Sequence, residues 1–407
     1  MDIKKISLVV SICFVFFIQC TTNDSKVIEE KETSEKYSDE IILLRNFIAK
    51  SLKTTTKKVV YDSNQNAFII DEDVFMPLEE ARNRYNDAGL NSTSKSSQMF
   101  SGWQMSPEMA SSVQVYIYPE VTPEWRIAID KAIINWNNAN SGIHITTINT
   151  ATTLSVKIRM GDIVSTSAIA NAYFPYAGNP GPWITINTAN KASKLSDAER
   201  ISAMTHELGH TFGLAHTDGT SGSLIPCTPV TEMASIMFSM VSDWSGFTAY
   251  DNIAISTLYP VAIGTKMLYR YKKNQYYFYT TNPCEIPPGK DGYDFDGDAG
   301  YLYSTQIPGT VPLYRILNGT TIKDHRLNKV KTSNDDIILG YIFTTQQPGT
   351  TALYSYGIYE SRMGQIPLYM YHYNYSTTDS EVVLKSIVGY VSSKVITKDG
   401  QKVHIWL

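Results

Sequence analysis

The chain has 407 residues, a net charge of −4 and only 18% charged residues, while 43% of its residues are hydrophobic. This length predicts two or three folding units with a substantial core, and the weak net charge excludes an electrostatic grip on nucleic acid. Eighteen of the 27 tyrosines lie after residue 264, whereas five of the six tryptophans lie between Trp103 and Trp244. We therefore expect two domains with different cores.

The N-terminus has the pattern of a bacterial export signal. Two lysines precede an apolar stretch at residues 6–18, which is shorter than the ~20 residues of a membrane-spanning helix and typical of a signal peptide over residues 1–20. The run Phe17-Ile-Gln-Cys20 resembles a lipoprotein box, although Gln19 stands where a small residue is usual. We expect lipidation of Cys20, with ordinary cleavage nearby as the alternative. The protein would then be an outer-membrane or cell-surface lipoprotein, or secreted, with a lipid anchor as its only membrane contact.

Residues 21–110 form a separate N-terminal region. Residues 21–58 are rich in Ser, Thr, Lys and Glu and contain one amphipathic segment at 40–52, which predicts a flexible stalk that carries a short helix. Residues 67–76 alternate like one strand, and residues 77–86 look helical. The sequence leaves open whether this region is a removable prosegment or an integral subdomain.

The next region, residues 111–262, alternates between strands and helices. Apolar residues at three- and four-residue steps predict an amphipathic helix over 123–139. This order of elements is typical of an α/β or α+β layer. The strands that we expect lie at 113–118, 143–147, 155–160 and 183–187.

A second helix carries the residues with chemical potential. Ser196 and Glu199 match the capping-box pattern, so the helix should begin there and end near Gly213. Inside it stand His206, Glu207 and His210, in the order His-Glu-Leu-Gly-His. Histidines four residues apart project from one helical face and can bind one ion at roughly 2.0–2.1 Å.

A third ligand follows the helix. Gly213 lets the chain turn, so that His216 can return to the same ion and leave the fourth position open for water, as in catalytic zinc sites. The carboxylate of Glu207 would take a proton from that water and later deliver it to the leaving amine. The alternative is a polar helix face with unrelated histidines, and the fixed spacing of Gly213 and His216 argues against it.

These residues resemble the metzincin zinc peptidases, whose pattern His-Glu-x-x-His-x-x-Gly-x-x-His is followed by a Met-turn. Met237 stands 21 residues beyond His216 and is the expected Met-turn residue, with Met240 as the second choice. Within this group, residues 205–218 and 225–229 most resemble the bacterial dual-action HEIGH metallopeptidases. The resemblance runs from about Phe68 to Pro260. It implies an α+β catalytic domain, one catalytic Zn²⁺, and a peptide substrate that lies antiparallel to an edge strand.

The chain after residue 264 contains an internal repeat. Residues 300–314 recur as residues 340–354, a displacement of 40 residues, and Pro-Gly turns stand at 308–309 and 348–349. Leu-Tyr pairs at Leu268, Leu313 and Leu368, together with Gly-Tyr pairs at Gly300, Gly340 and Gly389, suggest three copies of a short-strand unit. We expect an all-β domain over 265–407, most simply a β-trefoil.

This tail also resembles the tyrosine-rich repeat domain DUF5648. Its exposed tyrosines could stack on sugars or bind a cell-surface partner, although we expect most of them to fill the core. The run Asp291, Asp294, Asp296 and Asp298 hints at Ca²⁺, but it fails the EF-hand pattern and favours a solvated acidic turn.

Two further points concern the whole chain. Cys227 and Cys284 could form a disulfide in an oxidising compartment, but we favour two free or buried thiols. The leading hypothesis for function is an exported zinc endopeptidase with Glu207 as general base and acid. The rival is an adhesin or glycan-binding surface protein whose metal site is structural or silent.

Overall fold

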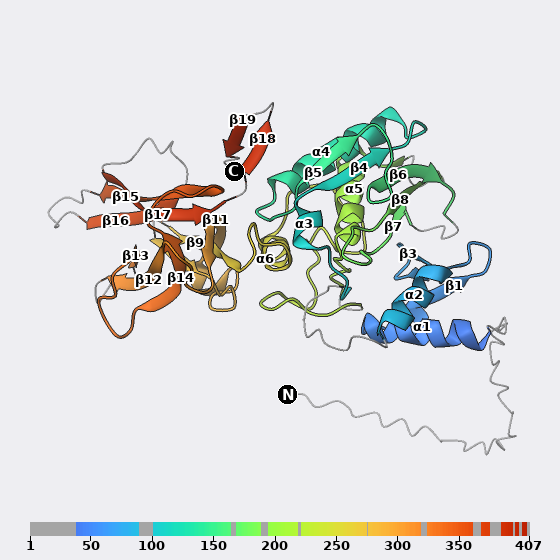
Figure 1. The fold of residues 1–407 in the computed structure, drawn as a ribbon, viewed down its shortest axis with the longest axis horizontal. Helices are drawn as coiled ribbons and strands as arrows, with labels where there is room; N and C mark the ends of the chain where they lie inside the picture. Colours follow the sequence, from blue (N-terminus) through green and yellow to red (C-terminus); the bar gives the residue numbers. More distant parts are fainter. Residues whose placement is uncertain are drawn as a thin grey trace, which may run out of the picture.

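The computed structural model divides the molecule into an α+β part and an all-β part (Figure 1). The predicted signal peptide and Cys20 lie outside the described residues. Among the residues that are described, no helix is long and apolar enough to span a membrane. The structure describes residues 38–88, 101–163, 168–188, 194–218, 221–274, 276–318, 324–360, 368–374, 384–393, 395–398 and 401–404.

One eight-stranded sheet, in the order β1-β2-β3-β7-β8-β6-β4-β5, organises the α+β part. Strands β4, β5, β6 and β8 pair in parallel, whereas β7 runs antiparallel to β8. Helices α4 and α5 pack against each other. The strands are β1 (Val59–Asp62), β2 (Ala67–Ile70), β3 (Val74–Pro77), β4 (Val113–Ile117), β5 (Ile145–Ile148), β6 (Val156–Gly161), β7 (Ala170–Ala172) and β8 (Trp183–Asn187), and the helices are α1 (Asp39–Ser51), α2 (Leu78–Ala88), α3 (Pro107–Ala110), α4 (Pro123–Asn138), α5 (Asp197–Thr211) and α6 (Ala249–Leu258).

The core explains why these elements form. The apolar face predicted for residues 123–139 is buried in α4, where Trp136 is fully enclosed and packs edge-on against Phe212. The buried residues of the central strands β4, β6 and β8 complete the same cluster. Both α4 and α5 are therefore fixed to one hydrophobic core.

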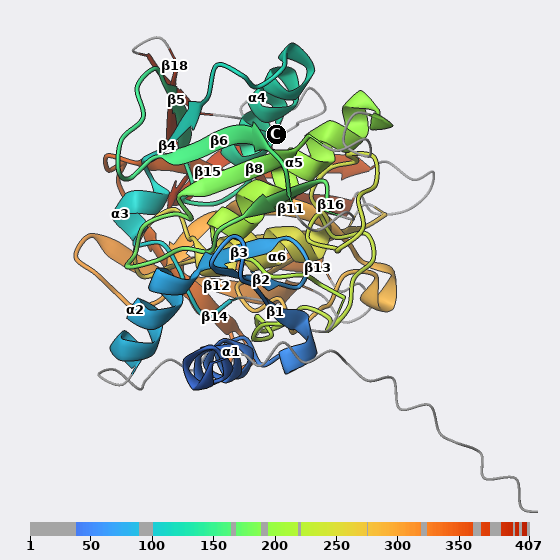
Figure 2. The same ribbon diagram turned by 90° about the vertical axis from the view of Figure 1, so that its right-hand side faces the viewer.

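Residues 38–88 fold into a compact unit that extends this sheet. Helices α1 and α2 pack beside the hairpins of β1, β2 and β3, and in Figure 2 the unit lies toward the viewer. The single strand predicted over 67–76 is wrong, because the chain turns at Asp71 and Glu72, whose φ values are 52° and 79°. Strand β3 then pairs in parallel with β7, through Val74 and Ala172.

The tail is all-β and consists of three similar three-stranded units. In each unit the first strand pairs with both of the others, in the order β10-β9-β11, β13-β12-β14 and β16-β15-β17. The third strands, β11, β14 and β17, pair with one another and close a ring. The strands are β9 (Thr265–Lys273), β10 (Tyr276–Thr280), β11 (Asp294–Tyr303), β12 (Thr310–Asn318), β13 (Asp324–Asn328), β14 (Ile337–Phe343), β15 (Thr350–Glu360), β16 (Leu368–Asn374) and β17 (Leu384–Ser392), followed by the hairpin β18 (Val395–Lys398) and β19 (Gln401–His404).

The same contacts recur in all three units. Each first strand begins with a buried threonine whose hydroxyl donates to the carbonyl three residues earlier, and each has a fully buried leucine three residues later. The third equivalent leucine is Leu353 in β15, so the Leu368 predicted for this role belongs to the neighbouring strand β16. In the ring, Gly300 approaches Val391 so closely that a Cβ would lie 2.3 Å from it. The Gly-Tyr pairs thus mark the places where neighbouring units touch.

Two aspartates of the predicted acidic run, Asp296 and Asp298, make contacts that stabilise β11. Asp296 pairs with Arg270 at 2.7 Å, and the buried Asp298 accepts a hydrogen bond from the Gly300 amide. Four tyrosines of the first unit are buried, as the core-filling interpretation expects. They are Tyr269, Tyr271, Tyr279 and Tyr301.

Cys227 and Cys284 form a disulfide, so the favoured prediction of two unpaired thiols is wrong. Sequence distance hid the pairing, because 57 residues separate the two cysteines and the fold brings their Cα atoms to 4.6 Å. The bridge joins a loop near His216 to the loop between β10 and β11. It therefore ties the two parts of the molecule together.

Removal of this disulfide should destabilise the protein. A bridge that closes a loop of this length contributes about 2–4 kcal/mol, mainly by restricting the unfolded chain. We expect the Cys227→Ser, Cys284→Ser double variant to lose that amount of unfolding free energy in denaturant titrations under oxidising conditions. Addition of a reductant should lower the stability of the wild type to that of the variant; equal stability of both proteins without reductant would contradict the prediction.

Candidate metal centre

Helix α5, which carries two of the candidate metal ligands, begins as the sequence predicts. The Ser196 hydroxyl accepts a hydrogen bond from the Glu199 amide at 3.0 Å, and the Glu199 carboxylate accepts from the Ser196 amide at 2.7 Å. This reciprocal cap fixes the first turn of α5, and every residue from Ser202 to Thr211 is buried. The helix therefore carries His206, Glu207 and His210 into the interior of the α+β part.

The structure brings His206, His210 and His216 together. Gly213, with φ of 95°, ends the helix and turns the chain back, and His216 Nε2 then lies 3.2 Å from His206 Nε2 and 3.3 Å from His210 Nε2. Ligand atoms of a tetrahedral zinc site with Zn–N bonds of about 2.0–2.1 Å lie ~3.3 Å apart. Both distances to His216 therefore match one zinc ion, and all the candidate ligand atoms lie within 4.8 Å of one another.

Partners behind the rings fix their orientation. His206 Nδ1 donates to the Ile236 carbonyl at 2.7 Å, and His210 Nδ1 donates to the Leu214 carbonyl at 2.8 Å. His216 Nδ1 faces the Asp71 carboxylate at 3.8 Å. Donation from Nδ1 leaves the Nε2 lone pair available for a metal, and such outer partners stabilise the liganding tautomer.

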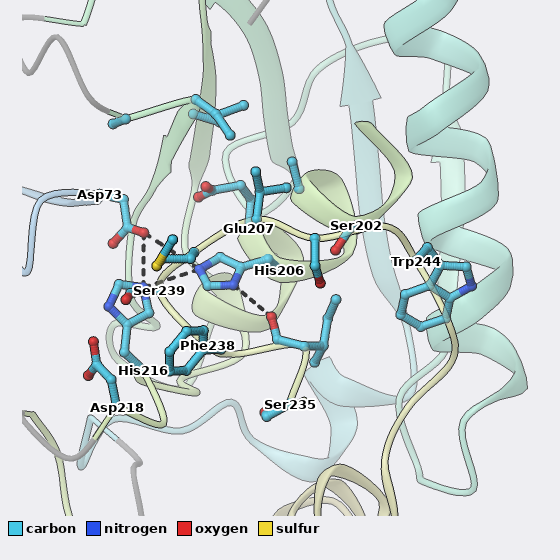
Figure 3. A pocket seen from close by; sticks show the side chains of 18 of the residues that line it. Asp73, Ser202, His206, Glu207, His216, Asp218, Ser235, Phe238, Ser239 and Trp244 are labelled. Carbon is cyan, nitrogen blue, oxygen red and sulfur yellow. Dashed lines mark hydrogen bonds and ion pairs between the residues drawn. The ribbon is translucent and has the colours of Figure 1, made fainter. Parts of the chain in front are cut away.

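Glu207 borders a cavity of about 710 Å³ beside the histidines (Figure 3). Its carboxylate is buried, and Oε2 has no hydrogen-bond partner within the described part of the chain. Burial, and then the nearby Asp73 carboxylate, raise the pKa of Glu207 well above its usual range. A buried carboxylate without a partner, next to three metal-binding nitrogens, is suited to accept a proton inside the cavity.

Asp73 is the residue that the sequence reasoning missed. Its Oδ2 lies 2.9 Å from His216 Nε2 and 3.5 Å from His206 Nε2, and its Oδ1 lies 3.6 Å from His210 Nε2. These four side chains form the one candidate metal-binding group among the described residues. The signal in the sequence was the acidic turn at 71–73 between two apolar strands, which the single-strand interpretation concealed.

The comparisons with known proteins agree with this site. Residues 70–259 match the family of dual-action HEIGH metallo-peptidases. The predicted resemblance is confirmed. Residues 239–341 match a domain of unknown function, DUF5648, which confirms the resemblance proposed for the tail. Together with the three histidines, the HEIGH match supports a zinc metallopeptidase with peptide or protein substrates.

Two solved structures of myroilysin are also similar to the chain, each at 17% identity over 37% of this chain. They are covered over 84% and 81% of their own lengths, with TM-scores of 0.27 and 0.26. No curated protein sequence matches the chain.

Met237, the predicted Met-turn residue, is buried against the helix that carries two of the histidines. The second choice, Met240, is 72% exposed. Met237 packs directly under Gly209 of the His-Glu-Leu-Gly-His segment, where a Cβ would lie 2.5 Å from the methionine sulfur. The glycine between the glutamate and the second histidine is therefore required by packing.

Asp251, at the start of α6, holds this loop in place. It is buried, and its carboxylate accepts from the Ser235 hydroxyl at 2.6 Å, from the Ile236 amide at 3.1 Å and from the Thr248 amide at 2.9 Å. Burial raises the pKa of Asp251, and these hydrogen bonds oppose that rise. Because the Ile236 carbonyl in turn accepts from His206, Asp251 orients a metal-binding ring through the backbone.

Proposed function

We propose that the protein is a zinc endopeptidase of metzincin type, in which His206, His210 and His216 hold the ion. The observation that carries this proposal is the convergence of three Nε2 atoms beside a buried glutamate that has no hydrogen-bond partner within the described residues. A zinc ion held by these histidines would supply Lewis-acid chemistry for the scissile carbonyl and for the attacking water. Met237 packs against Gly209 of helix α5, and the Ile236 carbonyl accepts from His206 and fixes its ring.

The role of Glu207 follows from its position. Its carboxylate stands at the cavity wall next to His206 (Figure 3). There it would take the proton of the attacking water and transfer it to the amine of the leaving peptide. The cavity continues past Ser202 toward Trp244, which gives room for a substrate side chain next to the reacting bond (Figure 3).

A peptide-library digestion tests the proposal. The assay compares zinc-loaded wild-type chain with the Asp73→Ala variant, because the Asp73 carboxylate lies against the three histidines. Internal cleavage of peptides that stops when 1,10-phenanthroline removes the zinc, and returns when zinc is added back, is the expected result. Absence of cleavage by both zinc-loaded proteins would refute the proposal.

Three finer points belong to this proposal. The ring of three repeat units supports a β-trefoil architecture for the tail. The accessory role that we propose for this tail is binding of a glycan or cell-surface ligand.

The N-terminal sequence supports export and lipidation at Cys20. The mass of the mature N-terminus tests the anchor, and a glycan array probed with the full chain tests the tail.

A further inference from the structure

A carboxylate from a distant part of the chain lies where a fourth metal ligand would stand. The carboxylate oxygens of Asp73 lie 2.9–3.6 Å from the three histidine Nε2 atoms, close to the ~3.3 Å spacing of tetrahedral ligands. Figure 3 shows Asp73 directly beside His216 and His206. We propose that residues 38–88 are a built-in inhibitor, in which Asp73 is the fourth zinc ligand and excludes water from the site.

This inference rests on the proposed peptidase function. Catalytic zinc sites keep one position open for water, whereas sites with four protein ligands are structural and closed. With Asp73 in place the histidine site has four protein ligands. The full chain is then latent, and the site opens when Asp73 withdraws.

The same unit also covers the edge at which a peptide substrate would bind. Strand β7 carries Ala170 and Ala172, and Ile169 and Ala170 line the cavity next to Glu207. Its outer edge is paired with β3, and the Ala172 amide donates to the carbonyl of Asp73 itself at 3.0 Å. An extended substrate would use these backbone groups. Asp73 thus blocks the metal with its side chain and the edge strand with its backbone.

The direction of β3 prevents it from acting as a substrate. Strand β3 runs parallel to β7, whereas the resemblance to metzincins implies an antiparallel substrate. Because β3 runs opposite to the direction expected for a substrate, its peptide carbonyls are not oriented for hydrolysis. The Asp73 carboxylate lies at the histidines instead. The segment therefore occupies the site without being presented for cleavage.

The turn before Asp73 is held under strain. Asp71 and Glu72 both have left-handed φ values, which are unfavourable for a residue such as glutamate. Lys58 pairs with Asp71 at 2.6 Å, and the hydroxyl of Ser221, from the loop after His216, donates to the same carboxylate. These contacts determine the turn and direct Asp73 toward the histidines.

A second contact region fixes the unit to the catalytic domain. Arg84 of α2 is buried and donates to the Pro175 carbonyl at 2.8 Å, while its guanidinium lies 4.0 Å from the centre of the Trp103 ring. Phe174, next to Pro175, belongs to the hydrophobic core of the N-terminal unit and contacts the His210 ring edge-on. The inhibitor is therefore anchored close to a metal-binding histidine.

Cobalt-loaded full-length protein tests the inference, because the visible spectrum of Co²⁺ reports its coordination. The proteins compared are the wild type, Asp73→Ala and the control Glu79→Gln, which changes an exposed carboxylate of α2 in the same unit, away from the cavity. Acetohydroxamate, a small metal chelator, should change the spectrum of Asp73→Ala and leave the other two unchanged. A wild-type spectrum that responds as strongly as that of Asp73→Ala would overturn the proposal.

Peptide hydrolysis by the zinc-loaded proteins gives the second measurement. Loss of one charged contact shifts a closed-to-open equilibrium by roughly tenfold or more, so Asp73→Ala should cleave at least that much faster than the wild type and Glu79→Gln. A rate for Asp73→Ala equal to or below the wild-type rate overturns the inhibitor. If Asp73→Ala fails to fold, Asp73→Asn keeps the size of the side chain, removes its charge and replaces it in both measurements.

The two measurements separate this inference from the proposed function. A spectral difference between Asp73→Ala and the wild type, with no hydrolysis by either, would refute the peptidase and leave the inhibitory contact supported. Hydrolysis at one rate by all three proteins, with one common spectral response, would support the peptidase and refute the inhibitor.

Discussion

Replacement of Glu207 by glutamine should slow peptide hydrolysis by orders of magnitude while zinc stays bound. Glu207 is a buried carboxylate beside the three candidate histidine ligands, and its Oε2 has no hydrogen-bond partner in the described part of the chain, as a general base requires. Loss of general acid and base catalysis costs roughly 10²–10⁴-fold in rate. We expect a decrease of that size in kcat/KM, measured with a fluorogenic peptide in the Asp73→Ala background, where the site is open.

The control for this experiment is Glu108→Gln, which changes an exposed glutamate of α3. It should retain the activity of its parent. Zinc content, measured by atomic absorption, should be one ion per chain in all of these proteins. Retained hydrolysis by Glu207→Gln, or loss of its zinc, would contradict the assigned role.

Replacement of Asp251 by alanine should weaken both the fold and the metal site. The change removes the acceptor for the Ser235 hydroxyl and for two backbone amides in a buried place. Loss of a buried hydrogen-bond network of this kind costs about 3 kcal/mol, because the donors remain unsatisfied. The Ile236 carbonyl would also lose its fixed position behind His206, and outer-shell losses of this type cost roughly tenfold or more in metal affinity.

Denaturant titration and competition with a zinc chelator measure these two effects. Asp130→Ala, which removes an exposed aspartate from α4, is the matched control and should change neither quantity appreciably. A variant that loses stability but binds zinc with wild-type affinity would refute the positioning role of Asp251. Unchanged stability would show that the buried network contributes nothing.

The catalytic helix could be predicted because its determinants are local. The capping pair Ser196 and Glu199, the i, i+4 spacing of the histidines and the turn at Gly213 each depend on neighbouring residues and helical geometry. The internal repeat was recognised for the same reason, since similar units leave similar sequences. These features require no knowledge of long-range contacts.

Features that depend on distant pairing could not be predicted in this way. Asp73 reaches the histidines through the parallel pairing of β3 with β7, which joins segments about a hundred residues apart. In the sequence, its turn looked like the middle of one alternating strand, because Asp71 and Glu72 are residues that rarely adopt left-handed φ values in tandem. The disulfide had no local signal either, since cysteine spacing in a chain with few cysteines does not indicate partners.

The disulfide has a consequence for a protease that is exposed to its own activity. The segment between Cys227 and Cys284 contains exposed loop residues, among them Val230, Met233 and Met240, and exposed loops are preferred sites of proteolytic nicking. A single cut anywhere in this segment leaves both fragments covalently joined through the two sulfur atoms. The all-β tail would therefore stay attached to the α+β part after self-digestion, for as long as the surroundings remain oxidising.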